Sequence, residues 1–165
     1  MFLKTVTELA ADFHDVRTVM LSDPREWLAG LGAEAGEDGD RLVVQVGLEV
    51  AGRQVGGDAE LEVGEPMTTG RVVMLPVRLR ARDHRRLFPT MEGSLDIAWL
   101  GRDRTYLSLG LTYEPPLGVV GRTADRALLH RVAETVAQRF LQAVADELMV
   151  RAGAPGAQSQ AGSCP

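Results

Sequence analysis

Few side chains in this sequence have the type and spacing needed for proton transfer. His130 and Glu134 are four residues apart in a helical stretch, so they share one face of the helix and can pair. Tyr113 ends a predicted strand and could place its hydroxyl inside the fold. Each feature also has a simpler explanation, the first as a solvent-exposed pair and the second as an amphipathic residue that packs. All three side chains are candidates for acid–base chemistry, without a complete catalytic motif around them.

A third candidate, centred on His84, is a cluster of basic residues. His84 lies with Arg82, Arg85 and Arg86 in the loop before Phe88. A basic rim above an apolar cavity would suit an amphipathic anion such as a fatty acid or an aromatic acid. A solvated strand face explains the same residues, because arginine on such a face discourages edge pairing. We keep both interpretations open.

Metal and covalent chemistry find little support in the sequence. The three histidines, His14, His84 and His130, show no ligand spacing, and there is no cysteine cluster. No serine lies in a nucleophile-elbow motif. The single cysteine, Cys164, closes no intramolecular disulfide, which is typical of a reducing compartment. We therefore predict no metal and no cofactor.

Length and charge narrow the class of protein further. The 165 residues suit one domain, and the net charge of -5 argues against general nucleic-acid binding. Residues 34–65 hold nine acids against two arginines, whereas residues 71–90 hold six arginines against one aspartate. Neighbouring segments of opposite charge are expected to pair or to share a solvated surface. Neither a signal peptide nor a membrane span is predicted, so we expect a cytoplasmic protein.

These candidates must be positioned by a strand-rich middle. Apolar and polar residues alternate with period two in five runs, which is typical of an antiparallel meander buried on one face: Leu42–Val50, Val55–Val63, Val73–Ala81, Leu95–Trp99 and Leu107–Leu111. A shorter strand, Phe2–Leu9, is predicted before them. The hairpin at Gly101 should form three pairs on one face: Trp99 with Thr105, Ile97 with Leu107, and Leu95 with Leu109.

Helical patterns flank the meander. Short helices are predicted over Phe13–Leu21, capped by Asp12, and over Pro24–Leu31, capped by Asp23. Residues 123–151 form a long amphipathic helix of roughly 40 Å. Its apolar positions recur every three or four residues: Leu128, Leu129, Val132, Val136, Phe140, Leu141, Val144 and Leu148.

Together these elements predict an α+β fold, in which a curved antiparallel sheet wraps around the long C-terminal helix. The domain should span residues 1–151, with residues 152–165 as a disordered tail. Gly57 and Ala59 occupy inner-face positions where larger side chains would fill space, which favours a hollow. A fully packed interior with a kinked strand fits the same residues.

Three local stretches carry a resemblance to a known superfamily. They are Leu21-Ser22-Asp23-Pro24-Arg25-Glu26-Trp27, Leu87-Phe88-Pro89-Thr90-Met91-Glu92-Gly93, and Tyr113-Glu114-Pro115-Pro116-Leu117-Gly118. With the element order, they resemble the START-like, polyketide cyclase (SRPBCC) helix-grip superfamily. The resemblance implies the helix-grip fold. The superfamily includes carriers, cyclases and oxygenase domains, so the resemblance does not indicate which activity this protein has.

The first hypothesis is non-covalent binding or transfer of an apolar or aromatic small molecule. It depends on an inner face built almost wholly from apolar residues. The expected lining is Trp99, Leu109, Leu111, Leu129, Val136 and Phe140, with Phe88 and Met91 at the mouth and Tyr113 near a strand end.

Two other functions stay open. The first is a cyclase or dehydratase acting on a hydrophobic substrate, with Tyr113, His130 or His84 moving protons. The second is a protein-interaction module with a filled core. The sequence leaves open whether the chain forms a homodimer.

Overall fold

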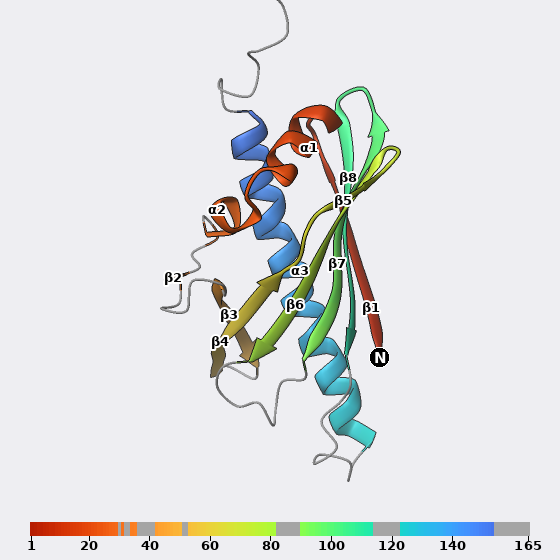
Figure 1. Cartoon of the computed structure of the whole chain (residues 1–165). Helices are drawn as coiled ribbons and strands as arrows, with labels where there is room; N and C mark the ends of the chain where they lie inside the picture. The colour runs from red at the N-terminus through yellow and green to blue at the C-terminus, as the bar shows by residue number, and fades with distance from the viewer. Residues whose placement is uncertain are drawn as a thin grey trace, which may run out of the picture.

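A computed structural model describes residues 1–29, 31, 34–35, 42–50, 53–81, 90–113 and 123–153. The elements follow in the order β1 (Phe2–Leu9), α1 (Phe13–Leu21), α2 (Pro24–Ala29), β2 (Glu34–Ala35), β3 (Leu42–Val50), β4 (Arg53–Val63), β5 (Met67–Thr69), β6 (Val72–Ala81), β7 (Met91–Gly101), β8 (Arg104–Tyr113) and α3 (Thr123–Ala152). Figure 1 shows one antiparallel sheet curving around α3. The predicted α+β architecture, including two short helices after the first strand, is confirmed.

The two short helices begin where their capping residues predict. The Asp12 carboxylate accepts a hydrogen bond from the His14 amide at 2.7 Å, and the Asp23 carboxylate accepts one from the Arg25 amide at 2.9 Å. Each bond satisfies one of the amides that a helix leaves free in its first turn. The second helix is shorter than predicted and ends at Ala29.

The strands of the described residues pair in the order β1-β8-β7-β6-β4-β3-β2, with β5 added beside β6. The predicted register of the β7–β8 hairpin is confirmed at all three of its pairs: Trp99 with Thr105, Ile97 with Leu107, and Leu95 with Leu109. A register shift between Trp99 and Gly101 then closes the hairpin. Two short strands were not predicted. β2 pairs with β3, and β5 folds back on β6 through Gly70, whose φ of 58° favours glycine.

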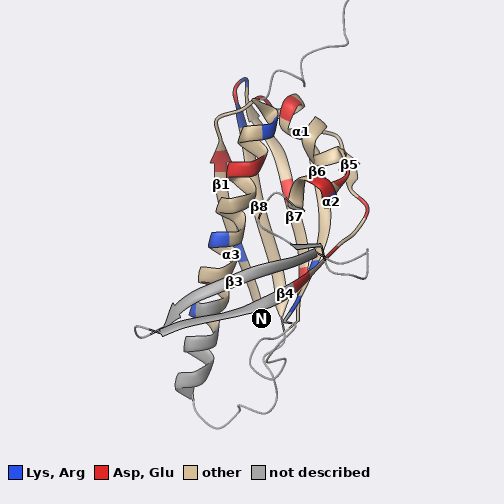
Figure 2. Ribbon diagram, turned by 90° about the vertical axis from the view of Figure 1, so that its left-hand side faces the viewer, with Lys and Arg blue, Asp and Glu red and all other residues tan. Residues whose placement is uncertain are grey.

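The oppositely charged segments meet in the sheet. Glu62 on β4 is the register partner of Arg78 on β6, and Arg78 in turn faces Glu92 on β7. The Arg78 guanidinium lies 2.8 Å from the Glu92 carboxylate and 3.7 Å from that of Glu62. These groups occupy the face of the sheet opposite the core, and the coloured part of α3 in Figure 2 carries charges of both signs. The prediction that the segments pair is confirmed for these residues.

The core lies between the other face of the sheet and the three helices. Leu75, Leu95, Ile97, Leu107 and Leu109 supply its strand side, and α3 supplies the side opposite them. The α1–α2 pair adds Val16, Met20, Trp27 and Leu28, which close one end of the same cluster. Burial of this apolar surface is the main force that holds the sheet on α3. None of the described helices combines the length and apolar character that crossing a bilayer requires.

Candidate functional site

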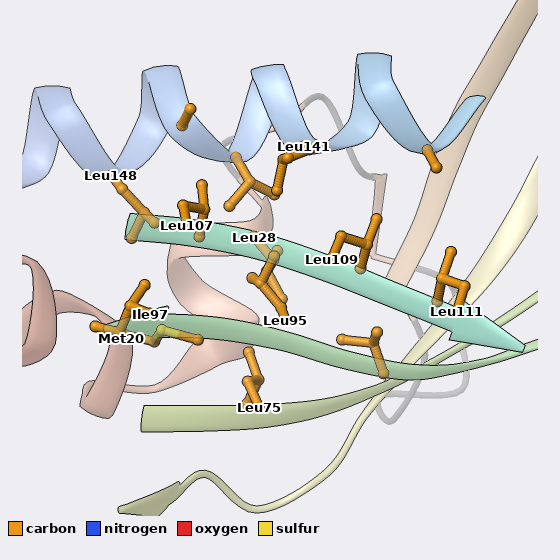
Figure 3. Packing of buried hydrophobic residues seen from close by; sticks show 14 of the residues in the cluster. Met20, Leu28, Leu75, Leu95, Ile97, Leu107, Leu109, Leu111, Leu141 and Leu148 are labelled. Carbon is orange, nitrogen blue, oxygen red and sulfur yellow. The ribbon is translucent and has the colours of Figure 1, made fainter. Parts of the chain in front are cut away.

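Two residues of the predicted lining, Leu109 and Leu111, are buried on the face of β8 that packs against α3, and a third, Val136, is buried on α3. Met91, predicted at the mouth, is buried on β7 beside them. Phe140 is half-buried and packs against the edge of the core. Figure 3 shows Leu107, Leu109 and Leu111 standing between β8 and α3. These side chains form one continuous apolar surface, although their burial does not by itself identify a ligand.

Trp99 lies elsewhere, which corrects its predicted place in the lining. Its side chain is 47 % exposed near the tip of the β7–β8 hairpin. Its amide donates a hydrogen bond to the Arg71 carbonyl at 3.2 Å, and the Arg71 guanidinium lies 4.7 Å from the ring centroid. The alternation along β7 is as predicted, but the strand pair reaches its tip here, where the buried Ile97 gives way to an exposed ring. The fully buried tryptophan is Trp27 on α2.

Three further candidates lie outside what the structure describes. Phe88 and His84 fall in residues 82–89, and the side chain of Leu129 falls in the first turns of α3. Their roles at the mouth, rim and lining stay predictions.

A polar group closes one end of the apolar surface. Tyr113 is the last residue of β8 and only 2 % exposed, beside its register partner Met91. Its hydroxyl lies 2.9 Å from Nδ1 of His130 on α3, and the two rings are inclined by only 21°. The other ring nitrogen, Nε2, lies 3.3 Å from the Glu134 carboxylate. The structure thus brings together Tyr113, His130 and Glu134, which we call the tyrosine–histidine–glutamate chain.

The backbone at Tyr113 is held as firmly as its side chain. Its amide donates to the Met1 carbonyl at 2.8 Å, and the amino group of Met1 in turn contacts the Tyr113 carbonyl oxygen. The end of β8, the residue before β1 and His130 of α3 therefore meet at Tyr113. A residue held through both its backbone and its hydroxyl is better placed for a specific contact than one on a free loop.

The protonation state of the tyrosine follows from its surroundings. Burial, and then the negative charge of Glu134, raises the pKa of Tyr113 above its ordinary value. The phenol is therefore neutral at physiological pH and keeps its proton available for a hydrogen bond. The tyrosine–histidine–glutamate chain can position a proton beside an apolar surface, which is the minimum that either specific binding or acid–base chemistry requires.

In the described part of the chain, no three His, Cys, Asp or Glu side chains come together as metal ligands. An open groove of about 490 Å³ runs along β4, β6 and β7, lined by Glu62, Val63, Gly64, Pro76, Val77, Arg78, Glu92 and Gly93. Its charged side chains point away from the core and pair with one another, so the groove is distinct from the apolar surface at Tyr113.

Comparison with known proteins identifies the fold. No model of a protein family matches the chain, and no curated protein matches it in sequence. Among solved structures, a norcoclaurine synthase point mutant from Thalictrum flavum, in complex with a transition-state analogue, aligns with a TM-score of 0.59 at 17% identity, over 92% of this chain and 93% of that one. A START superfamily protein from Mycobacterium smegmatis aligns with a TM-score of 0.51 at 20% identity, over 92% and 96%. This chain has the START-like helix-grip fold.

An aromatase/cyclase from Streptomyces sp. R1128 aligns with the same fold, with a TM-score of 0.50 at 18% identity over 92% of this chain and 93% of that one. At these identities the likeness extends to the fold and carries no residue roles. The function must therefore be argued from the site.

The sequence identified each member of the tyrosine–histidine–glutamate chain as a candidate but did not connect Tyr113 with the other two. The pairing of His130 with Glu134 was anticipated, whereas the bond from Tyr113 to His130 was not. Strand alternation predicts that Tyr113 shares the inner face of Leu111. It contains no information on which helix residue lies opposite.

Proposed function

We propose that this protein binds an apolar or aromatic small molecule, non-covalently, against the inner face of its sheet at the end near Tyr113. The observation that carries the proposal is the continuous apolar surface of Met91, Leu109 and Leu111, which ends at one buried hydroxyl. Ligand sites of this kind combine a mostly apolar lining with a few polar groups that fix orientation. The helix-grip fold, shared with a START superfamily protein and an aromatase/cyclase, supports the same proposal.

Side-chain volume supports this end of the fold as the place for a ligand. Among the described residues, the buried side chains of α3 farther from Tyr113 include two leucines; this group is Leu141, Val144, Ala145, Leu148 and Ala152. Nearer Tyr113 the buried helix residues are Ala133, Val136 and Ala137, none of them larger than valine. Small residues on this half of the helix let a ligand be accommodated by modest side-chain movement.

The first test is native mass spectrometry of the purified full chain, followed by solvent extraction of any co-purifying molecule. We expect a stoichiometric apolar passenger, or, in its absence, saturable binding of at least one member of a panel of fatty acids, sterols and polycyclic aromatics. Calorimetry and the emission of buried Trp27 would report such binding. A clean mass together with no saturable binding across the panel would contradict the proposal.

A matched pair of variants locates the site. Leu111→Thr places a hydroxyl on the inner face and shortens the side chain, and should weaken binding of an apolar ligand about tenfold or more. Thr112→Val changes the next residue, which is exposed on the opposite face, and should leave affinity unchanged. Equal affinities in the two variants would place the ligand elsewhere.

A second candidate function is an enzyme of the cyclase or dehydratase kind, favoured by the tyrosine–histidine–glutamate chain. Such an enzyme would exchange the acidic methylene protons of an apolar 1,3-diketone with solvent. Proton NMR in D₂O with benzoylacetone measures that exchange directly. Exchange that is faster with the protein than in buffer alone, and that slows to the buffer rate in Tyr113→Phe, would support catalysis. Exchange at the buffer rate with the unaltered protein would contradict catalysis and leave binding as the proposed function.

A further inference from the structure

The direction of the hydrogen bond between Tyr113 and His130 follows from the third member of the chain. An ionised carboxylate only accepts hydrogen bonds, so Glu134 requires a proton on the Nε2 atom of His130. In the neutral imidazole, Nδ1 then carries the lone pair. The Tyr113 hydroxyl, 2.9 Å from Nδ1, must therefore be the donor. This tautomer is inferred from the two partners of the ring.

With the bond in that direction, the acceptor capacity of the tyrosine oxygen is unused among the described residues. A phenolic hydroxyl has one proton and also accepts hydrogen bonds. The proton is used on His130, and among the described residues no donor bonds to the Tyr113 oxygen. What the site offers a ligand is thus an acceptor beside an apolar surface. A ligand oxygen without a proton would face the lone pairs of another oxygen.

We propose that the Tyr113 oxygen is the polar anchor of the ligand site and that it accepts a hydrogen bond from an apolar alcohol or phenol. His130 and Glu134 are positioning residues that hold the tyrosine proton away from the ligand. The site therefore selects hydroxylated apolar molecules over ethers and ketones of the same shape. This inference rests on the proposed binding function and deepens it.

The expected selectivity is about tenfold. A neutral hydrogen bond gained, together with the avoided cost of a buried acceptor without a donor, corresponds to roughly one order of magnitude in affinity. The raised pKa of Tyr113 keeps the phenol neutral at pH 7, where the probes are compared.

Three naphthalene probes separate the contributions. Naphthalene reports apolar binding alone, 2-naphthol adds a donor, and 2-methoxynaphthalene presents an acceptor without a proton. Calorimetry at pH 7 with the full chain should give about tenfold tighter binding of 2-naphthol than of 2-methoxynaphthalene. In Tyr113→Phe this preference should disappear while the affinity for naphthalene is unchanged.

The positioning residues make a sharper prediction. His130→Leu removes the acceptor for the tyrosine proton, which can then turn toward the ligand. The preference should shift toward 2-methoxynaphthalene by about threefold to tenfold. Glu134→Gln keeps a side-chain oxygen that can accept from Nε2 and should retain the preference for 2-naphthol. Replacing a merely structural histidine would not change the ligand selectivity at Tyr113.

The outcomes distinguish this inference from the function on which it rests. If none of the three probes binds and the broader ligand panel also fails, the proposed function is wrong. If naphthalene binds but 2-naphthol has no advantage, or its advantage survives in Tyr113→Phe, the anchor is wrong while apolar binding stands. A preference unchanged in His130→Leu would overturn the role of the histidine.

Discussion

Gly93, the register partner of Leu111, gives the sharpest test of how β7 and β8 pack near the site. A Cβ atom added there would lie 1.8 Å from the Gly110 carbonyl oxygen and 3.0 Å from the Leu111 Cα atom. Contacts under 3.0 Å essentially do not occur, so the strands must separate by about 1.2 Å in Gly93→Ala. That movement weakens about two ladder hydrogen bonds, worth about 1 kcal/mol each, and adds about 1–3 kcal/mol of overpacking. We expect a loss of about 3–5 kcal/mol in the free energy of unfolding.

Urea unfolding followed by far-UV circular dichroism measures this loss, and Gly110→Ala is the matched control. A Cβ atom at Gly110 meets only the Phe2 ring, at the ordinary distance of 3.7 Å. Its stability should be unchanged, or raised by up to about 1 kcal/mol because the unfolded chain loses freedom. If both variants unfold at the same urea concentration, β7 and β8 do not approach as closely as described. The argument that this strand pair fixes the position of Tyr113 would then fail.

Three other perturbations test separate parts of the structure. Absorbance titration should show Tyr113 ionising above the ordinary value of about 10, and Glu134→Gln should lower that pKa by removing a negative charge. Because the pKa of the folded state is the raised one, the associated stability is complete below about pH 10 and is lost as the pH rises further. Leu109→Ala should cost about 3–5 kcal/mol in a urea titration, since the residue is fully buried. Arg71→Ala should change the emission of Trp99 at a cost of under about 1 kcal/mol, because the cation–π contact is exposed.

The strand faces could be predicted because their signal is local. Alternation with period two assigns the residues of β7 and β8 to faces, and the three predicted pairs are those that place apolar residues of both strands on one face, so they were predicted correctly. The register shift between Trp99 and Gly101 was not predicted. Trp99 shows the limit of that signal. Alternation gives the face of a residue but not whether any other element covers that face at the end of the strand. Burial of Ile97 and exposure of Trp99, two residues apart on one face, differ for this reason.

Trp27 shows a second limit of the sequence signal. It follows a helix start that was predicted from its caps, yet its burial could not be inferred from six residues of helix. A helix this short has no reliable apolar stripe, and its orientation is set by packing against α1 and α3. The capping residues fix where such a helix begins, and the tertiary contacts fix which side chain it buries.

The tyrosine–histidine–glutamate chain depends on which side of α3 faces the sheet. The sequence contains a signal for that side in the spacing of the buried residues, but alanines in the set make it less visible than large apolar residues would. The buried stripe of the helix runs through Ala133, Ala137, Leu141, Val144 and Leu148, and two of its members are alanines. Leu148 follows His130 by 18 residues, which at 3.6 residues per turn is about five full turns. His130 therefore points in the same direction as a fully buried leucine. His130 lies at the N-terminal end of this stripe, where its side chain is 34 % exposed. On β8 the inward residues Leu107, Leu109 and Leu111 have no polar side-chain atom, and the next inward residue, Tyr113, is the partner of the His130 Nδ1 atom.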